Sequence, residues 1–169
     1  MPPKTPMLKV KTLLAQARSH RPVLVSNSNI VQITFGRTVA GQDAHGYYRA
    51  IQATALTNRP KKKPKRVEIR LYWPEQSGWI PEVLRPQRAG YVYSGPAKPP
   101  PFTIETDAWA SCSCEYFLYH CEVADTRKGS SSIRYSNGAA PHITNPQLVS
   151  HLCKHILAAL RKGALVVKK

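Results

Sequence analysis

Acidic side chains are scarce in this sequence. Nine Asp and Glu stand against 25 Lys and Arg among 169 residues, which gives a formal net charge of +16. Paired carboxylates for general acid and base catalysis are therefore hard to assemble. The sequence also has no glycine-rich phosphate loop and no Cys-x-x-Cys redox pair. We expect a protein that is not an enzyme.

Long apolar runs are missing as well. No stretch approaches the roughly 18 to 20 apolar residues that cross a bilayer, and the N-terminal residues lack the apolar core of a signal peptide. These absences predict an intracellular protein with no membrane partner. In a reducing compartment, four clustered cysteines favour metal binding over disulfides.

The positive charge is concentrated in the first third of the chain. Up to Arg66 there are 13 basic residues and the single acid Asp43, a balance of +12, while the remainder carries +4. Such a surface attracts anionic partners. Nucleic acid, an acidic protein surface and an anionic membrane would each meet this electrostatic demand, and the sign of the charge does not choose among them.

The apolar pattern predicts an α+β fold with a small antiparallel sheet. Alternation of apolar and polar residues predicts strands at 30–35, 47–55 and 67–73. An N-terminal helix is expected at 6–19, begun by Thr5 and Pro6 as cap and first helical position. Two further short strands are predicted at 79–84 and 91–93.

A dense basic stretch connects the second and third predicted strands. Its charged residues include Lys61, Lys62, Lys63, Lys65 and Arg66. These side chains are candidates for contact with nucleic acid or with an acidic partner. The alternative is a solvated hairpin loop whose charges oppose aggregation.

Four prolines between Gly95 and Pro101 indicate a break in regular structure. The sequence thus divides into a basic helix and sheet region at 1–94, a proline-rich linker at 95–108, and a cysteine-containing region at 109–169.

Three cysteines and a histidine have the spacing of a metal site. Cys112 and Cys114 are separated by one residue, and Cys153 and His155 follow after 38 intervening residues. Three thiolates and one imidazole form a closed tetrahedral shell suited to structural Zn²⁺, with no open position for a reactive water. The competing interpretation is that these cysteines are small buried hydrophobes, which is the role expected of Cys121.

Cys153 and His155 stand at the start of a predicted helix. Its apolar face consists of Leu152, Ile156, Leu157, Ala159 and Leu160, and Gly163 is expected to end it. A bound zinc would therefore staple this C-terminal helix to the Cys112–Cys114 turn. The remaining candidate ligands are His120, His142 and His151, none of which has the paired spacing of His155.

The pattern Cys-x-Cys followed by Cys-x-His before an apolar helix resembles the SWIM zinc finger family, whose four corresponding positions bind zinc. The resemblance covers residues 109–162, with an interval longer than the usual family loop. Segments 114–119, 135–138, 145–146 and 152–155 are similar to a SWIM-like subgroup associated with tailed-phage structural proteins. In the second of these, Asn137-Gly138 favours a type I′ turn.

This resemblance implies a non-enzymatic assembly protein of a virion, located at the head-tail junction, tail or baseplate. Its partners would be other subunits with acidic surfaces. The alternative function is a basic nucleic-acid-binding adaptor with a SWIM-type zinc finger, which would place the protein in the cytoplasm.

Overall fold

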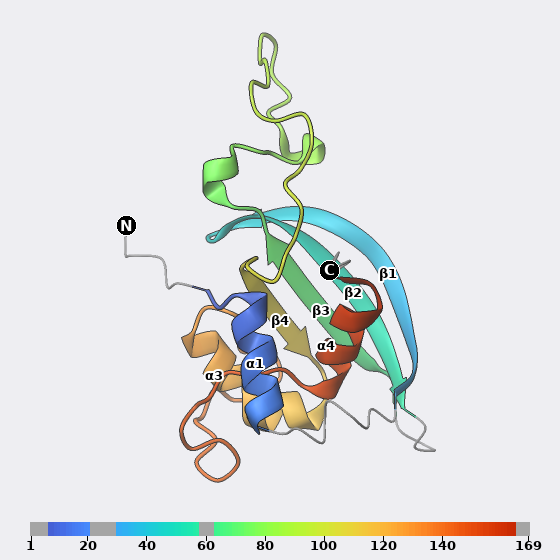
Figure 1. Cartoon of the computed structure of the whole chain (residues 1–169), viewed down its shortest axis with the longest axis vertical. Helices are drawn as coiled ribbons and strands as arrows, with labels where there is room; N and C mark the ends of the chain where they lie inside the picture. The colour runs from blue at the N-terminus through green and yellow to red at the C-terminus, as the bar shows by residue number, and fades with distance from the viewer. Residues whose placement is uncertain (1–6, 21–29, 58–62, 165–169) are drawn as a thin grey trace.

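The computed structural model describes residues 7–20, 30–57 and 63–164. It shows an α+β fold in which a four-stranded antiparallel sheet of order β1-β2-β3-β4 carries helices on one face (Figure 1). The strands are β1 (Ile30–Asp43), β2 (Gly46–Thr57), β3 (Lys65–Tyr72) and β4 (Ala108–Cys112). The predicted fold class and the antiparallel sheet are confirmed.

Strand β1 continues well past the end that the alternation predicts. Between the pairs Phe35↔Ala53 and Thr38↔Ile51 the register shifts, so that Gly36 and Arg37 occupy a β-bulge. A bulge interrupts the period of two while pairing continues beyond it, which explains why the apolar alternation stops at Phe35 and the strand does not.

Helix α1 (Val10–His20) begins later than predicted. Lys9 instead forms a β-bridge with Asp107. The Val10 N–H then donates to the Thr106 carbonyl at 3.0 Å, and the Lys11 N–H donates to that of Ile104 at 2.8 Å. Since the first N–H groups of a helix have no partner within the helix, the 104–106 segment satisfies them here. The predicted cap at Thr5 and Pro6 lies outside the described residues.

The core lies between the sheet and the helices α1 and α4 (Lys154–Ala159). The sheet contributes Ile51, Ala53, Val67, Ile69, Leu71, Ala108 and Ala110, α1 contributes Val10 and Leu13, and α4 contributes Ile156 and Leu157. All five residues of the predicted C-terminal apolar face, which are Leu152, Ile156, Leu157, Ala159 and Leu160, belong to the hydrophobic core. The helix does not end at Gly163, because a π-helical turn continues it as η4 (Leu160–Ala164).

Residues 74–103 form an arm that projects from one end of the sheet (Figure 1). The prediction of strands at 79–84 and 91–93 is wrong. The only regular elements of this arm are the short 3₁₀ turns η1 (Glu75–Ser77) and η2 (Glu82–Leu84). Side-chain contacts replace strand pairing. The Ile80 N–H donates to the Tyr93 hydroxyl at 3.1 Å, and the Arg85 guanidinium lies 3.8 Å from the Tyr93 ring centroid.

Strand β4 returns from the arm and completes the sheet. It pairs with β3 from Leu71↔Ala108 to Val67↔Cys112. A π-helical turn η3 (Phe117–Cys121) and helix α3 (Glu122–Arg127) follow it. The first predicted metal ligand therefore sits at the end of a strand that belongs to the main sheet.

Candidate metal centre

Cys112, Cys114, Cys153 and His155 come together in one buried cluster. Each offers one ligand atom, and these four atoms all lie within 4.8 Å of one another. The residues arrive from two places, the end of β4 and the start of α4. Three thiols and one imidazole at these separations can hold a metal ion.

The backbone after β4 turns the second thiol toward the first. Cys112 is the last residue of β4 and pairs with Val67. The chain then bends, so that the Leu118 N–H donates to the Cys114 carbonyl at 3.1 Å. The Phe117 N–H donates to the Cys114 sulfur at 3.3 Å. This contact orients the sulfur from outside the cluster, as the supporting groups of metal ligands do.

The other two ligands are placed by the first turn of α4. Cys153 is the N-cap residue in an extended conformation, and its carbonyl accepts the N–H of Leu157 at 3.1 Å. His155 lies two residues further, and its Nδ1 is 3.9 Å from the Cys153 sulfur. The other ring nitrogen, Nε2, is buried without a hydrogen-bond partner among the described residues.

The thiols affect one another strongly. Hydrogen bonding from Cys112 and Cys153 lowers the pKa of the Cys114 thiol. The contact with Cys114 raises the pKa of Cys112, and burial raises the pKa of Cys153. Three neighbouring sulfurs cannot all carry negative charge in a buried site without a compensating cation. A bound metal ion supplies that charge and deprotonates its thiol ligands.

The other cysteine and the other histidines stand outside the cluster. Cys121 is fully buried in the hydrophobic core, as predicted. His151 uses Nδ1 toward the Val149 carbonyl at 2.8 Å and Nε2 toward the Tyr116 hydroxyl at 3.0 Å. His120 contacts the Thr144 carbonyl at 3.1 Å, and His142 is exposed. None of these three histidines joins the metal cluster.

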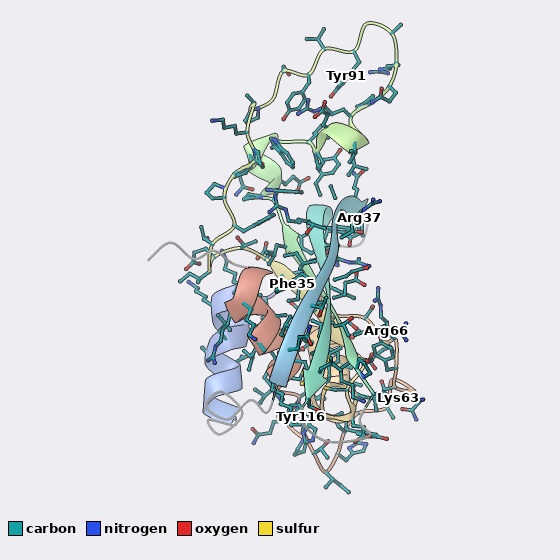
Figure 2. The ribbon with its side chains drawn as sticks, turned by 90° about the vertical axis from the view of Figure 1, so that its right-hand side faces the viewer. Phe35, Arg37, Lys63, Arg66, Tyr91 and Tyr116 are labelled. Carbon is teal, nitrogen blue, oxygen red and sulfur yellow. The ribbon has the colours of Figure 1, made fainter. Side chains whose placement is uncertain are left out.

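The structure describes only part of the basic stretch between β2 and β3. Lys61 and Lys62 lie outside the described residues, while Lys63 and Arg66 are exposed and Lys65 begins β3 in a half-buried position. Figure 2 shows Arg37, Arg66 and Lys63 along the side of the sheet that faces away from α1 and α4. The bulge in β1 thus adds Arg37 to this basic side.

Sequence reasoning missed a network on the same outer face of the sheet. Arg70 donates to Glu68 at 2.9 Å and to Asp43 at 3.1 Å, and Arg134 donates to the other Glu68 oxygen at 2.9 Å. Both guanidinium groups stack on Trp109, at 4.3 Å for Arg70 and 4.6 Å for Arg134. The alternating strand pattern places Glu68 and Arg70 on one face, but it does not reveal Arg134, which is 64 or more residues away in sequence.

The loop after α3 is held by a buried carboxylate, that of Glu122, which no pattern in the sequence singles out. Glu122 accepts the backbone N–H groups of Arg134, Tyr135 and Ser136 at 2.9, 3.0 and 2.7 Å. The type I′ turn predicted at Asn137-Gly138 is wrong, because it needs positive φ at both residues. Gly138 has φ 77°, yet Asn137 does not have positive φ. Its side chain instead accepts the Ala139 N–H at 3.0 Å.

Comparison of the chain with protein-family models, with curated proteins and with solved structures gives no match. Within the described residues, no helix has the length and apolar character needed to cross a membrane.

Proposed function

We propose that this chain is a zinc-binding assembly protein in which the metal is structural. The observation that carries the proposal is the buried set of four ligand atoms within 4.8 Å of one another. Zn²⁺ favours such a combination of thiolate and imidazole ligands. Four protein ligands complete a tetrahedral shell, so the ion would serve folding and not catalysis.

The ligand arrangement supports a stapling role. Cys112 and Cys114 would hold the ion from the end of β4, and Cys153 and His155 from the start of α4. Between these pairs lies the long segment that contains η3, α3 and the loop to residue 152. A metal at this position closes that segment into a loop, and its binding energy adds to the stability of the fold.

The arm supports an assembly role. It projects from the sheet, and its apolar residues Val83 and Val92 are 76% and 83% exposed. The hydroxyl of Tyr93 and the stacked Arg85 hold the arm in one shape. An ordered projection with exposed apolar side chains suits insertion into a neighbouring subunit, since little entropy is lost on binding.

The resemblance to phage-associated SWIM-like segments supplies the biological setting of this proposal. In that setting the chain is a tailed-phage virion component at the head-tail junction, tail or baseplate. Its basic side would then face acidic surfaces of other subunits.

A second candidate function is a nucleic-acid-binding adaptor. The exposed Lys63 and Arg66 on the basic side of the sheet favour it, together with the charge of +12 carried up to Arg66. Such binding must weaken steeply as salt is added, because condensed counterions are released.

Metal content and native mass test the primary proposal. The purified chain and any particle that contains it would be measured by native mass spectrometry and elemental analysis, with nucleic acid scored by the absorbance ratio. One zinc per chain within a protein assembly supports the proposal. One zinc per chain in a monomer that carries nucleic acid favours the adaptor, and a folded chain without metal contradicts both.

A further inference from the structure

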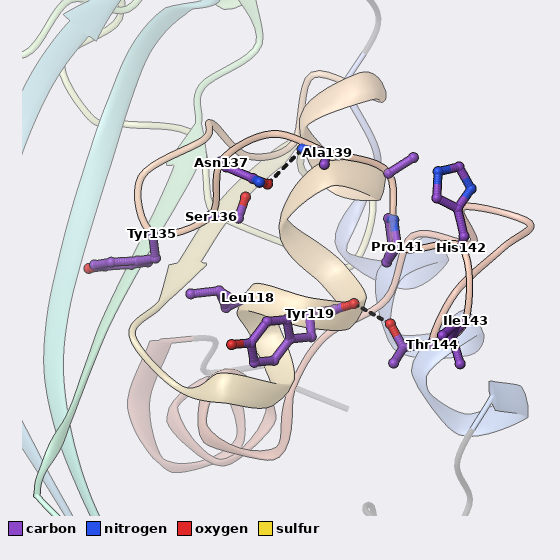
Figure 3. Close-up of a pocket in the computed structure, with 11 residues that line it drawn as sticks. Leu118, Tyr119, Tyr135, Ser136, Asn137, Ala139, Pro141, His142, Ile143 and Thr144 are labelled. Atoms are coloured by element: carbon purple, nitrogen blue, oxygen red, sulfur yellow. Dashed lines mark hydrogen bonds between the residues drawn. The ribbon is translucent and has the colours of Figure 1, made fainter.

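Two hollows meet at Tyr135 on the side of the molecule that carries the basic residues. The first, the outer-sheet pocket, has a volume of about 340 Å³ and is lined by Gln52, Thr54, Arg66, Ser111, Arg134 and Tyr135 among others. The second, the 118–144 groove, has a volume of about 580 Å³ and lies between η3 and the loop at 135–144 (Figure 3). Both volumes are in the range of small-molecule sites.

The outer-sheet pocket has the chemistry of an anion site. Arg66 forms no ion pair with a carboxylate of the described residues. Glu68 also lines the pocket, but its two oxygens are already engaged by Arg70 and Arg134. Ser111 is 2% exposed, and its hydroxyl has no hydrogen-bond partner among the described residues. A buried hydroxyl without a partner is costly, and a bound oxyanion would satisfy it.

The strand register explains why these groups converge. Gln52 pairs with Glu68, and Glu68 pairs with Ser111, so the three side chains form one row across β2, β3 and β4. Thr54 and Arg66 form the next row on the same face. Side chains in paired positions point to the same side of a sheet, and the pocket is therefore built on a rigid base.

The 118–144 groove has different walls. Its lining is mainly apolar and includes Tyr119, Pro141 and Ile143, while Ser136 and Asn137 add polar groups. Tyr119 is 58% exposed and Ile143 is 94% exposed. The Thr144 hydroxyl donates to the Tyr119 carbonyl, which fixes the loop against η3 (Figure 3). Apolar walls with a few polar groups suit a flat heteroaromatic ring with a hydrogen-bonding edge.

Tyr135 borders both hollows and is 37% exposed. Its backbone N–H is held by the buried Glu122 carboxylate at 3.0 Å. The ring is thus an exposed aromatic surface on a fixed backbone between an anion pocket and an apolar groove. The anion pocket, the Tyr135 ring and the apolar groove lie next to one another. A nucleic acid offers matching groups, because each of its nucleotides carries one phosphate and one base.

We propose that this side of the protein binds single-stranded nucleic acid. A phosphate occupies the outer-sheet pocket at Arg66 and Ser111, and a neighbouring base enters the 118–144 groove against Tyr135. The strand is single because bases in a duplex are stacked and paired, whereas unpaired bases stack freely on aromatic side chains. An acidic peptide would match the charge but would leave the groove without an aromatic occupant. The inference rests on the nucleic-acid-binding candidate above and adds the strand class and the contact residues.

The test measures binding of a fluorescein-labelled oligothymidylate to the full, metal-loaded chain by fluorescence anisotropy at two salt concentrations. Arg66→Glu and Tyr135→Ala are each expected to weaken binding roughly tenfold or more, given the usual contribution of a stacked base. Arg88→Glu and Tyr91→Ala carry the same changes on the arm and are expected to leave binding within about twofold. Ile143→Asp, at an exposed position that does not support the core, is expected to weaken binding as well.

Competition identifies the ligand class. Unlabelled single strands should displace the probe, while duplex DNA and poly-glutamate should compete at least tenfold less well. Equal competition by the duplex overturns the single-strand assignment, and equal competition by poly-glutamate favours an acidic protein partner. If the wild type binds but the site variants behave like the arm controls, the site is wrong and the adaptor function stands. If the wild type binds no nucleic acid at low salt, the single-strand site and the adaptor function are both wrong.

Discussion

Arg66 and Ser113 hold each other through two hydrogen bonds. The Arg66 N–H donates to the Ser113 hydroxyl at 2.9 Å, and the Ser113 N–H donates to the Arg66 carbonyl at 3.0 Å. Ser113 is the residue between Cys112 and Cys114. The basic side of the sheet is therefore tied directly to the turn that carries two candidate metal ligands, and disturbance of this turn should displace Arg66.

Replacing Cys153 with Ser should abolish metal binding and unfold the chain. The binding energy of a structural metal is part of the folding energy, and a domain of this size has only about 5 to 15 kcal/mol of stability to lose. Elemental analysis should show a loss of one zinc per chain, and circular dichroism should show the loss of cooperative melting.

Cys121→Ser is the matched control for this prediction. Cys121 is equally buried but packs in the core outside the cluster. This variant should keep its metal and lose only about 1 to 3 kcal/mol for a buried hydroxyl. Equal loss of metal in both variants would contradict the assigned ligand set.

Replacing Glu122 with Gln should destabilise the protein by roughly 2 to 4 kcal/mol, because three backbone N–H groups would lose a charged acceptor in a buried site. Urea denaturation measures the change. The exposed Glu115→Gln removes the same charge and should stay within about 0.5 kcal/mol of the wild type. A neutral effect of Glu122→Gln would mean that the 134–136 loop is held by other contacts.

Replacing Arg70 with Lys should cost about 1 to 3 kcal/mol. The guanidinium pairs with Asp43 and Glu68 while it stacks between the rings of Tyr48 and Trp109. An ammonium keeps the charge but cannot keep the planar geometry. Thermal melts of Arg70→Lys and of Arg88→Lys on the arm provide the comparison, and similar melting temperatures would refute the structural importance of the stack.

Replacing Asp125 with Asn should raise stability at neutral pH. Burial raises the pKa of Asp125 well above its usual range, and the nearby polar groups of Ser150 and the His151 backbone offset this effect only in part. The folded state therefore binds this proton more tightly than the unfolded state, and the contribution of Asp125 to stability falls as pH rises through the folded pKa.

The measurement is urea unfolding of both proteins between pH 5 and pH 8. The difference in unfolding free energy between Asp125→Asn and the wild type should grow with pH, which separates this effect from the pH dependence of metal binding common to both. A constant difference would show that the carboxyl stays charged in the folded protein.

The clustering of the four candidate ligands could be predicted from the sequence because they occur in two pairs with fixed local geometry. A strand end places Cys112 beside Cys114, and a helix start places Cys153 beside His155. The central strands were predictable for a similar reason, since the alternation in 67–73 follows from one buried and one exposed face.

The arm and the outer face could not be predicted in this way. The arm is shaped by contacts of single side chains such as Tyr93, which have no periodic signature. The outer-sheet pocket needs Arg134 and Tyr135 from a distant loop, and that loop is positioned by Glu122, a lone buried acid. Tertiary contacts of this kind leave no local pattern in the chain.

Because every cysteine is buried, the folded protein should be unreactive toward thiol reagents. All four sulfurs lie in the metal cluster or in the core. A cysteine introduced at Val83 or Val92 on the arm would therefore be the unique site of maleimide attachment under native conditions. A photo-crosslinker carried there would covalently capture whatever the arm touches, with no need to remove the native cysteines first.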